Sequence, residues 1–116
     1  MFIRDRVRGT KYIVHMSNDK WYWSSMPAQH LKHAKARAVE SNKWVVRATL
    51  DGISQIISPR SIESSVILER GEMGSITHEI TLNSQDTFYI KHGDTPLLII
   101  SVLSLMFGIF FRNYEK

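Results

Sequence analysis

The chain has 116 residues, so it is at most one ordinary domain with a modest core. Lysine and arginine outnumber aspartate and glutamate by 15 to 11, for a formal net charge of +4, but the excess cations are scattered along the chain. Nucleic-acid binding calls for cations clustered on one face among aromatic side chains, so we expect no nucleic-acid partner. The absence of cysteine excludes disulfides, thiolate metal sites and a cysteine nucleophile from this chain.

The N-terminal region alternates charged and apolar residues and lacks the continuous apolar run of a signal peptide, so no leader is predicted. Arg4–Arg8 is interpreted as the last turn of a helix that Gly9 ends, because glycine tolerates a left-handed backbone. Tyr12–Met16 is a β-branched and aromatic run, which predicts a buried strand. A turn is predicted at residues 17–19.

An amphipathic helix is predicted next. Pro27 suits a first helical turn, and residues 28–43 carry apolar side chains at helical spacing. The predicted buried positions are Leu31, Ala34, Ala38 and Val39. Small side chains let a helix lie close to a sheet, which favours a layered α/β architecture. His30 and His33 could chelate a metal but lack a third ligand nearby, so we interpret both as solvent-facing and predict no metal site and no cofactor.

A run of strands is predicted after the helix. Residues 44–49 and 53–58 read as two strands separated by a turn at residues 51–52. Residues 62–68 and 74–82 are predicted as two more. The last of these alternates apolar and polar side chains, as a half-buried strand does.

The longest apolar run covers residues 95–111. At about 1.5 Å per residue it spans roughly 25 Å, near the lower limit for crossing a hydrocarbon core of about 30 Å. Tyr89 and Tyr114 flank the run at positions where interfacial aromatic residues commonly lie. We therefore predict a transmembrane helix here, with a buried core helix as the alternative, followed by a short tail at residues 112–116.

The basic residues beside this run predict its orientation. Arg112 and Lys116 lie on its C-terminal side, against Lys91 on the N-terminal side. Because cytoplasmic flanks of membrane helices are enriched in lysine and arginine, the C-terminus is predicted to be cytoplasmic. The strand-rich part would then lie outside.

Three sequence motifs occur in a fixed order: SNDKWYW at residues 17–23, RAVE at residues 37–40 and RATLDGIS at residues 47–54. The segment YIKHGDTPLL at residues 89–98 then leads directly into the apolar run. Together they resemble the C-terminal part of a bacterial apolipoprotein N-acyltransferase, the inner-membrane member of the nitrilase, or carbon-nitrogen hydrolase, superfamily. The resemblance covers nearly the whole chain but only the last quarter or so of a family member.

The resemblance implies a fold and a location. Residues 1–94 would be the C-terminal part of an α-β-β-α nitrilase-like sandwich, followed by one transmembrane helix. The nitrilase-like part would lie on the outer, periplasmic side of the bacterial inner membrane. The implied partners are membrane phospholipid, a lipoprotein substrate and the missing N-terminal half of the enzyme.

The resemblance also implies acyl transfer in two steps. A cysteine thiolate takes an acyl chain from a phospholipid as a thioester, and the α-amino group of a diacylglyceryl-cysteine lipoprotein then accepts it. The family's glutamate, lysine and cysteine lie upstream of the matched region, so no catalytic residue is assigned here. We therefore predict that this chain alone is inactive. The alternative hypothesis is a non-catalytic, tail-anchored membrane module that binds a protein partner.

Two sets of site residues follow from the resemblance. The rim of an acyl pocket would contain Asn18, Asp19, Trp21 and Trp23. For Asn18 and Asp19 the alternative is a simple Asx turn. A structural scaffold would contain Arg37, Glu40, Arg47 and Gly52. Within it, Glu40 and Arg47 are interpreted as a buried pair, with Arg37 as another partner for the glutamate. The chain departs from the family at Trp23, where members usually have glycine, and at residues 50–51, where they often have Asn-Asn or Asn-Thr.

Overall fold

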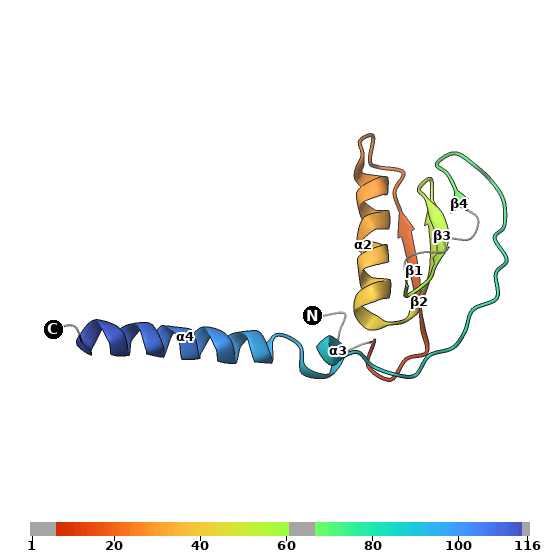
Figure 1. Ribbon diagram of the computed structural model, residues 1–116. Coiled ribbons are helices and arrows are strands. Elements are labelled where there is room, and N and C mark those ends of the chain that lie inside the picture. Colours follow the sequence, from red (N-terminus) through yellow and green to blue (C-terminus); the bar gives the residue numbers. More distant parts are fainter. Residues whose placement is uncertain (1–6, 61–66, 115–116) are drawn as a thin grey trace.

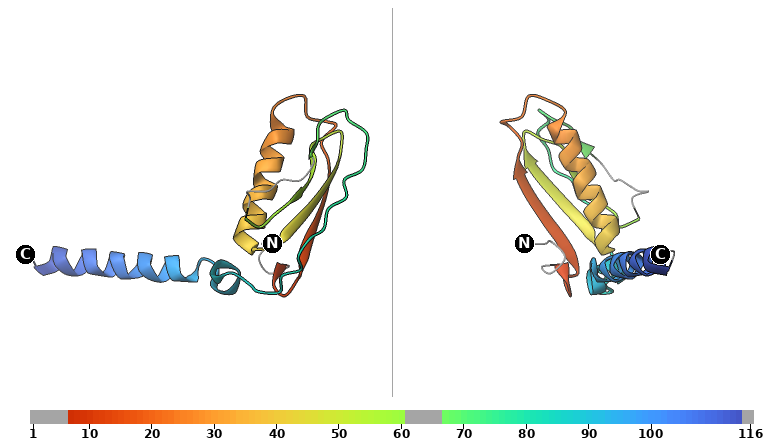
Figure 2. Two further views of the ribbon diagram at one scale, coloured as in Figure 1. Left: turned by 45° about the vertical axis from the view of Figure 1, so that its right-hand side comes forward. Right: turned by 90° about the vertical axis from the view of Figure 1, so that its left-hand side faces the viewer.

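The computed structural model of the chain describes residues 7–60 and 67–114. A four-stranded sheet with a helix on one face forms an α/β module, and a long helix leaves one end of it (Figure 1). The principal extents are 70 × 35 × 26 Å, so the molecule is elongated. Two further views show the same layering, with the helix on one side of the sheet only (Figure 2). The predicted mixed α/β architecture is confirmed.

The first three elements form a β-α-β unit. Strand β1 (Tyr12–Asn18) is followed by helix α2 (Met26–Ser41) and strand β2 (Trp44–Leu50). β1 and β2 are parallel, with Tyr12 opposite Trp44 and Asn18 opposite Leu50. Because parallel strands end at the same edge of a sheet, the segments that follow β1 and β2 lie together. This edge contains the candidate site.

Two shorter strands complete the sheet in the order β1-β2-β3-β4. β3 (Ser54–Ile57) is antiparallel to β2, and β4 (Ile67–Leu68) is antiparallel to β3. Asp51, in the tight turn between β2 and β3, has a positive φ of 53°. An aspartate tolerates this conformation better than most residues, so a tight turn is possible here.

Helix α2 packs on the sheet through small and branched side chains. Its buried residues Leu31, Ala34 and Ala38 contact Val45 and Ile57 of the sheet. Asn42 ends the helix in the left-handed conformation, and its N–H donates to the carbonyl groups of residues 38 and 39. The predicted buried position at residue 39 is wrong. The Val39 side chain is 51% exposed, because one helical step turns it about 100° from Ala38 and off the sheet.

The prediction of a buried first strand is also wrong. β1 forms an edge of the sheet, and Tyr12, Val14 and Met16 are 46%, 56% and 78% exposed. These side chains alternate with half-buried ones, which face α2. The strand continues through Asn18, so the chain leaves the sheet at Asp19, not at residue 17. The apolar content of residues 12–16 predicts a strand correctly. How far its side chains are buried depends on whether another segment covers the face away from α2.

Residues 74–82 form no strand, contrary to the alternation of their side chains. Ile76 and Ile80 are half-buried, and the ring of His78 lies 5.4 Å from that of Trp44. An alternating segment becomes a strand only when a neighbouring strand supplies hydrogen bonds, and this segment has none in the described structure. Residues 62–66 of another predicted strand, and residues 4–6 of the predicted first helix, lie outside the described residues. Val7 is helical, and Gly9 follows with a φ of 76°.

The segment before the C-terminal helices is attached to the end of α2. Lys43, whose side chain is 0% exposed, donates from Nζ to the carbonyl oxygens of Asn83 at 2.8 Å and Gln85 at 3.0 Å. The same Nζ lies 3.4 Å from Asp86 Oδ1. The hydroxyl of Thr87 donates to a carbonyl of α2 at 2.7 Å. These bonds fix where the chain enters the last two helices.

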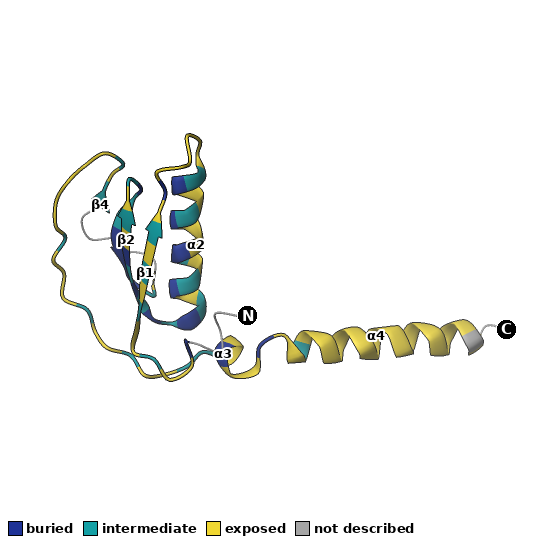
Figure 3. Ribbon diagram, turned by 180° about the vertical axis from the view of Figure 1, so that it is seen from behind, coloured by how far each residue is buried: buried dark blue, intermediate teal, exposed yellow. Residues whose placement is uncertain are grey.

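A short helix, α3 (Phe88–His92), leads through two residues into α4 (Thr95–Tyr114). Over Thr95–Arg112 the mean hydropathy of α4 is 1.9, and 0% of this window is buried (Figure 3). Within the described residues, α4 is therefore not a buried core helix. In the described part of the chain, α4 is the helix that is long and apolar enough to cross a membrane. It extends past the predicted end at residue 111.

Candidate functional site

A buried ion pair lies where β1 and β2 end. Arg47 Nη2 donates to Asp19 Oδ2 at 2.9 Å, and the two residues are 2% and 1% exposed. Arg47 Nε also donates to the carbonyl oxygen of Ile53 at 3.1 Å. The backbone N–H of Asp19 donates to the carbonyl oxygen of Leu50 at 3.0 Å, which ties the chain after β1 to the end of β2. The pair is thus held by main-chain bonds as well as by charge.

Two histidines, His15 and His30, contact this pair. We call the four residues together the Asp19–Arg47 network. His15 Nδ1 lies 2.8 Å from Arg47 Nη1, and His30 Nδ1 lies 3.0 Å from Asp19 Oδ1. A guanidinium can only donate, so Nδ1 of His15 is an acceptor and its ring proton lies on Nε2. A carboxylate can only accept, so Nδ1 of His30 carries a proton. Each histidine tautomer is therefore set by its neighbour.

Burial governs the electrostatics of the network. Desolvation lowers the pKa of His15 below 6.5, and the adjacent Arg47 charge lowers it further. Burial also lowers the pKa of Arg47, while the Asp19 carboxylate opposes this change. His15 is therefore neutral at pH 7, in agreement with its role as an acceptor.

His30 is only half-exposed, whereas its helical position predicts a solvent-facing side chain. Its side chain is 29% exposed, and its ring packs edge-on against Tyr22 at 5.4 Å. His33 is exposed on the outer side of α2. Within residues 7–60 and 67–114, no group of three or more histidine, aspartate and glutamate side chains could hold a metal ion.

The residues predicted at a pocket rim separate into two environments. Trp21 and Trp23 are 80% and 93% exposed, and they border a hollow of about 550 Å³ that Lys20, Asp51 and Arg70 also line. Asp19, by contrast, turns its carboxylate into the module. Asn18 Oδ1 accepts a hydrogen bond from the backbone N–H of residue 20 at 3.1 Å, which is an Asx turn.

Arg70 connects the β2–β3 turn to the loop between β1 and α2. This loop carries Trp21, Tyr22 and Trp23 and is called the aromatic loop below. Its Nη1 donates to the carbonyl oxygen of Tyr22 at 2.7 Å, and its Nη2 donates to Asp51 Oδ2 at 3.1 Å. The guanidinium thereby positions the loop that carries both exposed tryptophans. No sequence motif pointed to Arg70, because its partners are 48 and 19 residues away along the chain.

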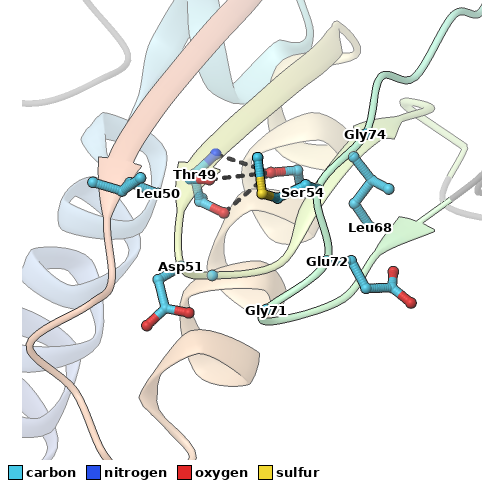
Figure 4. Close-up of a pocket in the computed structure, with 10 residues that line it drawn as sticks. Thr49, Leu50, Asp51, Ser54, Leu68, Gly71, Glu72 and Gly74 are labelled. Carbon is cyan, nitrogen blue, oxygen red and sulfur yellow. Dashed lines mark hydrogen bonds between the residues drawn. The ribbon is translucent and has the colours of Figure 1, made fainter.

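A second hollow, of about 410 Å³, lies beside the same turn (Figure 4). Ser54 Oγ accepts from the backbone N–H of Thr49 at 3.0 Å on its wall. Gly52 lies against the ion pair: a Cβ at this position would be 2.5 Å from Asp19 Oδ2. Only glycine fits so close to the carboxylate, which gives Gly52 a packing role at this turn.

Of the two partners expected for Glu40, the structure shows Arg37, and the expected buried pair of Glu40 with Arg47 is wrong. Glu40 pairs with Arg37 one helical turn earlier on α2, and its side chain is 21% exposed. Arg47 pairs with Asp19 and not with Glu40. The two residues of the real pair are 28 positions apart, and only the parallel register of β1 and β2 brings them together. Among the described residues, the network contains no thiol, so it can position neighbouring groups but offers no cysteine nucleophile.

No family model matches the chain. The chain is 33% identical to an apolipoprotein N-acyltransferase from Shewanella oneidensis over 98% of its own length and 22% of that protein. It is also similar to apolipoprotein N-acyltransferases from Nostoc sp. (33% identity, 97% of this chain, 23% of that protein) and Caulobacter vibrioides (38%, 79% and 18%). The chain thus spans about a fifth of the length of these relatives and corresponds to a C-terminal part of them.

Proposed function

We propose that this chain, which is homologous to the C-terminal part of apolipoprotein N-acyltransferases, serves as the membrane-anchored C-terminal part of such an enzyme. The activity would be phospholipid-dependent N-acylation of the N-terminal diacylglyceryl-cysteine of a lipoprotein. The observation that carries the proposal is the match of 98% of the chain to one family, extending from the α/β module into the apolar helix α4. A membrane anchor suits a reaction whose donor and acceptor are both lipids, because it raises their effective concentration.

On its own, this chain would transfer no acyl group. A thioester acyl-enzyme requires a thiol, and the sequence contains no cysteine. The glutamate, lysine and cysteine of the proposed reaction would come from the upstream four fifths of the enzyme. The role of this chain would be to complete the fold and to hold the loops beside the pocket.

The uncovered side of the sheet supports a missing partner segment. Tyr12, Val14 and Met16 expose apolar surface on the face away from α2, and within the described residues no strand pairs with the outer edge of β1. A second sheet packed on this face would produce the α-β-β-α nitrilase-like sandwich over residues 1–94.

In this proposal the two parts of the candidate site have different roles. The Asp19–Arg47 network, with Gly52, fixes the ends of β1 and β2. The exposed Trp21 and Trp23 form part of the rim of the acyl pocket. Their large apolar surfaces suit contact with an acyl chain.

The proposed location is the bacterial inner membrane. The module would lie on the periplasmic side, where the lipoprotein substrate is modified, and residues 112–116 would lie in the cytoplasm. Arg112, in the last turn of α4, and Lys116, after it in the sequence, support this orientation through the positive-inside rule.

A chimera tests the proposal. The matched C-terminal region of the Shewanella oneidensis relative is replaced by this chain, and acyl transfer from labelled phospholipid to a diacylglyceryl-cysteine peptide is measured by mass spectrometry. We expect activity from the chimera and none from this chain alone. A folded but inactive chimera, or transfer by this chain alone, would contradict the proposal.

The alternative is a non-catalytic, tail-anchored module that binds a protein partner. The same open sheet face favours it, because exposed apolar side chains on a sheet commonly form an interface. Val14→Asp would then abolish binding of that partner while the chimera stayed inactive. An active chimera decides against this alternative.

A further inference from the structure

The direction of α4 relative to the module determines which surface faces the membrane. α4 extends toward the side of the sheet that carries α2, and α2 runs across the direction of α4 (Figure 1). The view along α4 shows α2 in front of the sheet (Figure 2), and the view from behind shows the same arrangement (Figure 3). If α4 crosses a membrane along its axis, α2 lies between the sheet and the membrane surface, parallel to it.

The connection between module and helix α4 is short and well held. Ile90 of α3 is 3% exposed, and the N–H of Gly93 donates to the carbonyl oxygen of Tyr89 at 2.6 Å. Lys43 holds the preceding residues to the end of α2. Only Gly93 and Asp94 separate α3 from α4. The module therefore lies close to the point where α4 would enter the membrane.

The outer face of α2 is cationic. Lys32, His33 and Ala36 are exposed, and Lys35 is half-exposed beside them. The acidic side chain of α2 is Glu40, which Arg37 already neutralises. With about 1.5 Å per residue, the 16 residues of α2 provide a face roughly 24 Å long. Two unpaired lysines on long flexible stems can reach an adjacent charged surface.

We propose that this outer face of α2 docks on the anionic phospholipid headgroups of the membrane that α4 crosses. Charge complementarity favours this occupant, because a cationic helix lying parallel to the surface attracts anionic lipid. Docking brings the aromatic loop that precedes α2 to the level of the headgroups, within reach of membrane lipids. The inference rests on the membrane span proposed above and adds the lipid class that this surface recognises.

The absence of cysteine allows a direct test on the full chain. An environment-sensitive fluorophore is attached through Ala36→Cys on the outer face of α2 or, as a matched control, through Met73→Cys, which is 99% exposed in the segment after β4. Each labelled chain is reconstituted into phosphatidylcholine vesicles with or without phosphatidylglycerol. Both leaflets contain headgroup-linked quencher.

We expect several-fold stronger quenching at residue 36 than at residue 73, and stronger quenching with phosphatidylglycerol than without it. Each lysine near an anionic surface contributes about 1 kcal/mol, so Lys32→Gln and Lys35→Gln should each lower the docking equilibrium about five-fold. Gln29→Lys, on the same exposed face, should raise it by a similar factor. Equal quenching at the two positions, or quenching at residue 36 that is independent of phosphatidylglycerol, would overturn the proposal.

Alkaline extraction of the same vesicles distinguishes a failure of the proposed membrane span of α4 from a failure of the proposed docking of α2. Release of the chain would show that the membrane span is absent and would overturn both proposals. A retained chain with an unquenched label at residue 36 would overturn the docking alone.

Discussion

Each end of the α/β module contains a buried cation, but the partners of the two cations differ. At the site end, the side chain of Arg47 is 0% exposed and pairs with a carboxylate, that of Asp19. At the opposite end, the equally buried Lys43 donates mainly to main-chain carbonyl oxygens of residues 83 and 85. The site end therefore depends on the charge of one side chain, whereas the end beside α3 and α4, called the α4 end below, depends on the path of the main chain.

The largest effect should come from breaking the side-chain pair. Asp19→Ala leaves the Arg47 guanidinium buried without its carboxylate, which should lower the free energy of unfolding by about 3–5 kcal/mol. Denaturant unfolding in detergent micelles, followed by tryptophan fluorescence, measures the loss. Asp19→Asn keeps an acceptor for Arg47 and should cost less. Equal losses for the two variants would show that the charge does not matter.

The next effect should come from the α4 end. Lys43→Met keeps the length of the side chain but leaves two carbonyl oxygens without their donor, for a loss of about 1.5–3 kcal/mol. Hydrogen exchange should rise at residues 83–87 more than in β1. A uniform rise across the module would mean that Lys43 stabilises the whole fold and not this attachment. The variant therefore separates the two ends.

A smaller effect should follow from crowding the site end without removing a charge. Gly52→Ala places a methyl group 2.5 Å from Asp19 Oδ2, and displacing the carboxylate should cost about 1–3 kcal/mol. The control is Gly74→Ala, whose new methyl group would meet Leu68 Cδ2 at 3.1 Å. That side chain is flexible, so the control should lose less stability in the same unfolding experiment. A larger loss of stability for Gly74→Ala than for Gly52→Ala would contradict the expectation that the Asp19 carboxylate is held rigidly.

The smallest effect concerns pH at the site end. The pKa of His15 is lowered in the folded chain, so the unfolded chain binds more protons once the pH falls below 6.5. The contribution of His15 to stability is therefore present above pH 6.5 and is lost as the pH falls through its folded pKa. His15→Gln keeps an acceptor for Arg47 but cannot titrate. Thermal unfolding across this range should show a shallower loss for the variant, and identical profiles would contradict the assignment.

Local patterns in the sequence predicted much of the fold. The apolar spacing and Pro27 predicted α2, and β-branched runs predicted β2 and β3. Burial was predicted less well, because it depends on what covers each face. Val39 and the apolar side chains of β1 match the composition of a core but are exposed. Residues 74–82 alternate as a strand does, yet they have no strand partner in the described structure.

Arg47, one residue of the buried ion pair, is predicted from the sequence as a scaffold residue, but its partner is not predicted correctly. The position of Arg47 in β2 is predicted correctly, whereas its expected partner is Glu40, because a glutamate in a packed helix needs a charged or hydrogen-bonding partner. Motif position carries no information about which side chains meet across strands. The histidines at positions 15 and 30 had no motif at all. Their roles follow from a contact between segments that are distant in sequence.

The apolar run of α4 and the lack of cysteine are fully determined by composition and order along the chain. The order of the motifs is also determined by the sequence, and this order relates the chain to its relatives. Only the tertiary structure decided that Asp19 meets Arg47 and that the cationic face of α2 lies on the side from which α4 leaves. Composition and helical period act between near neighbours in the sequence. The pairing of distant charges and the direction of α4 depend on strand register and on the bonds that hold the chain at residues 83–87, and no local pattern specifies either.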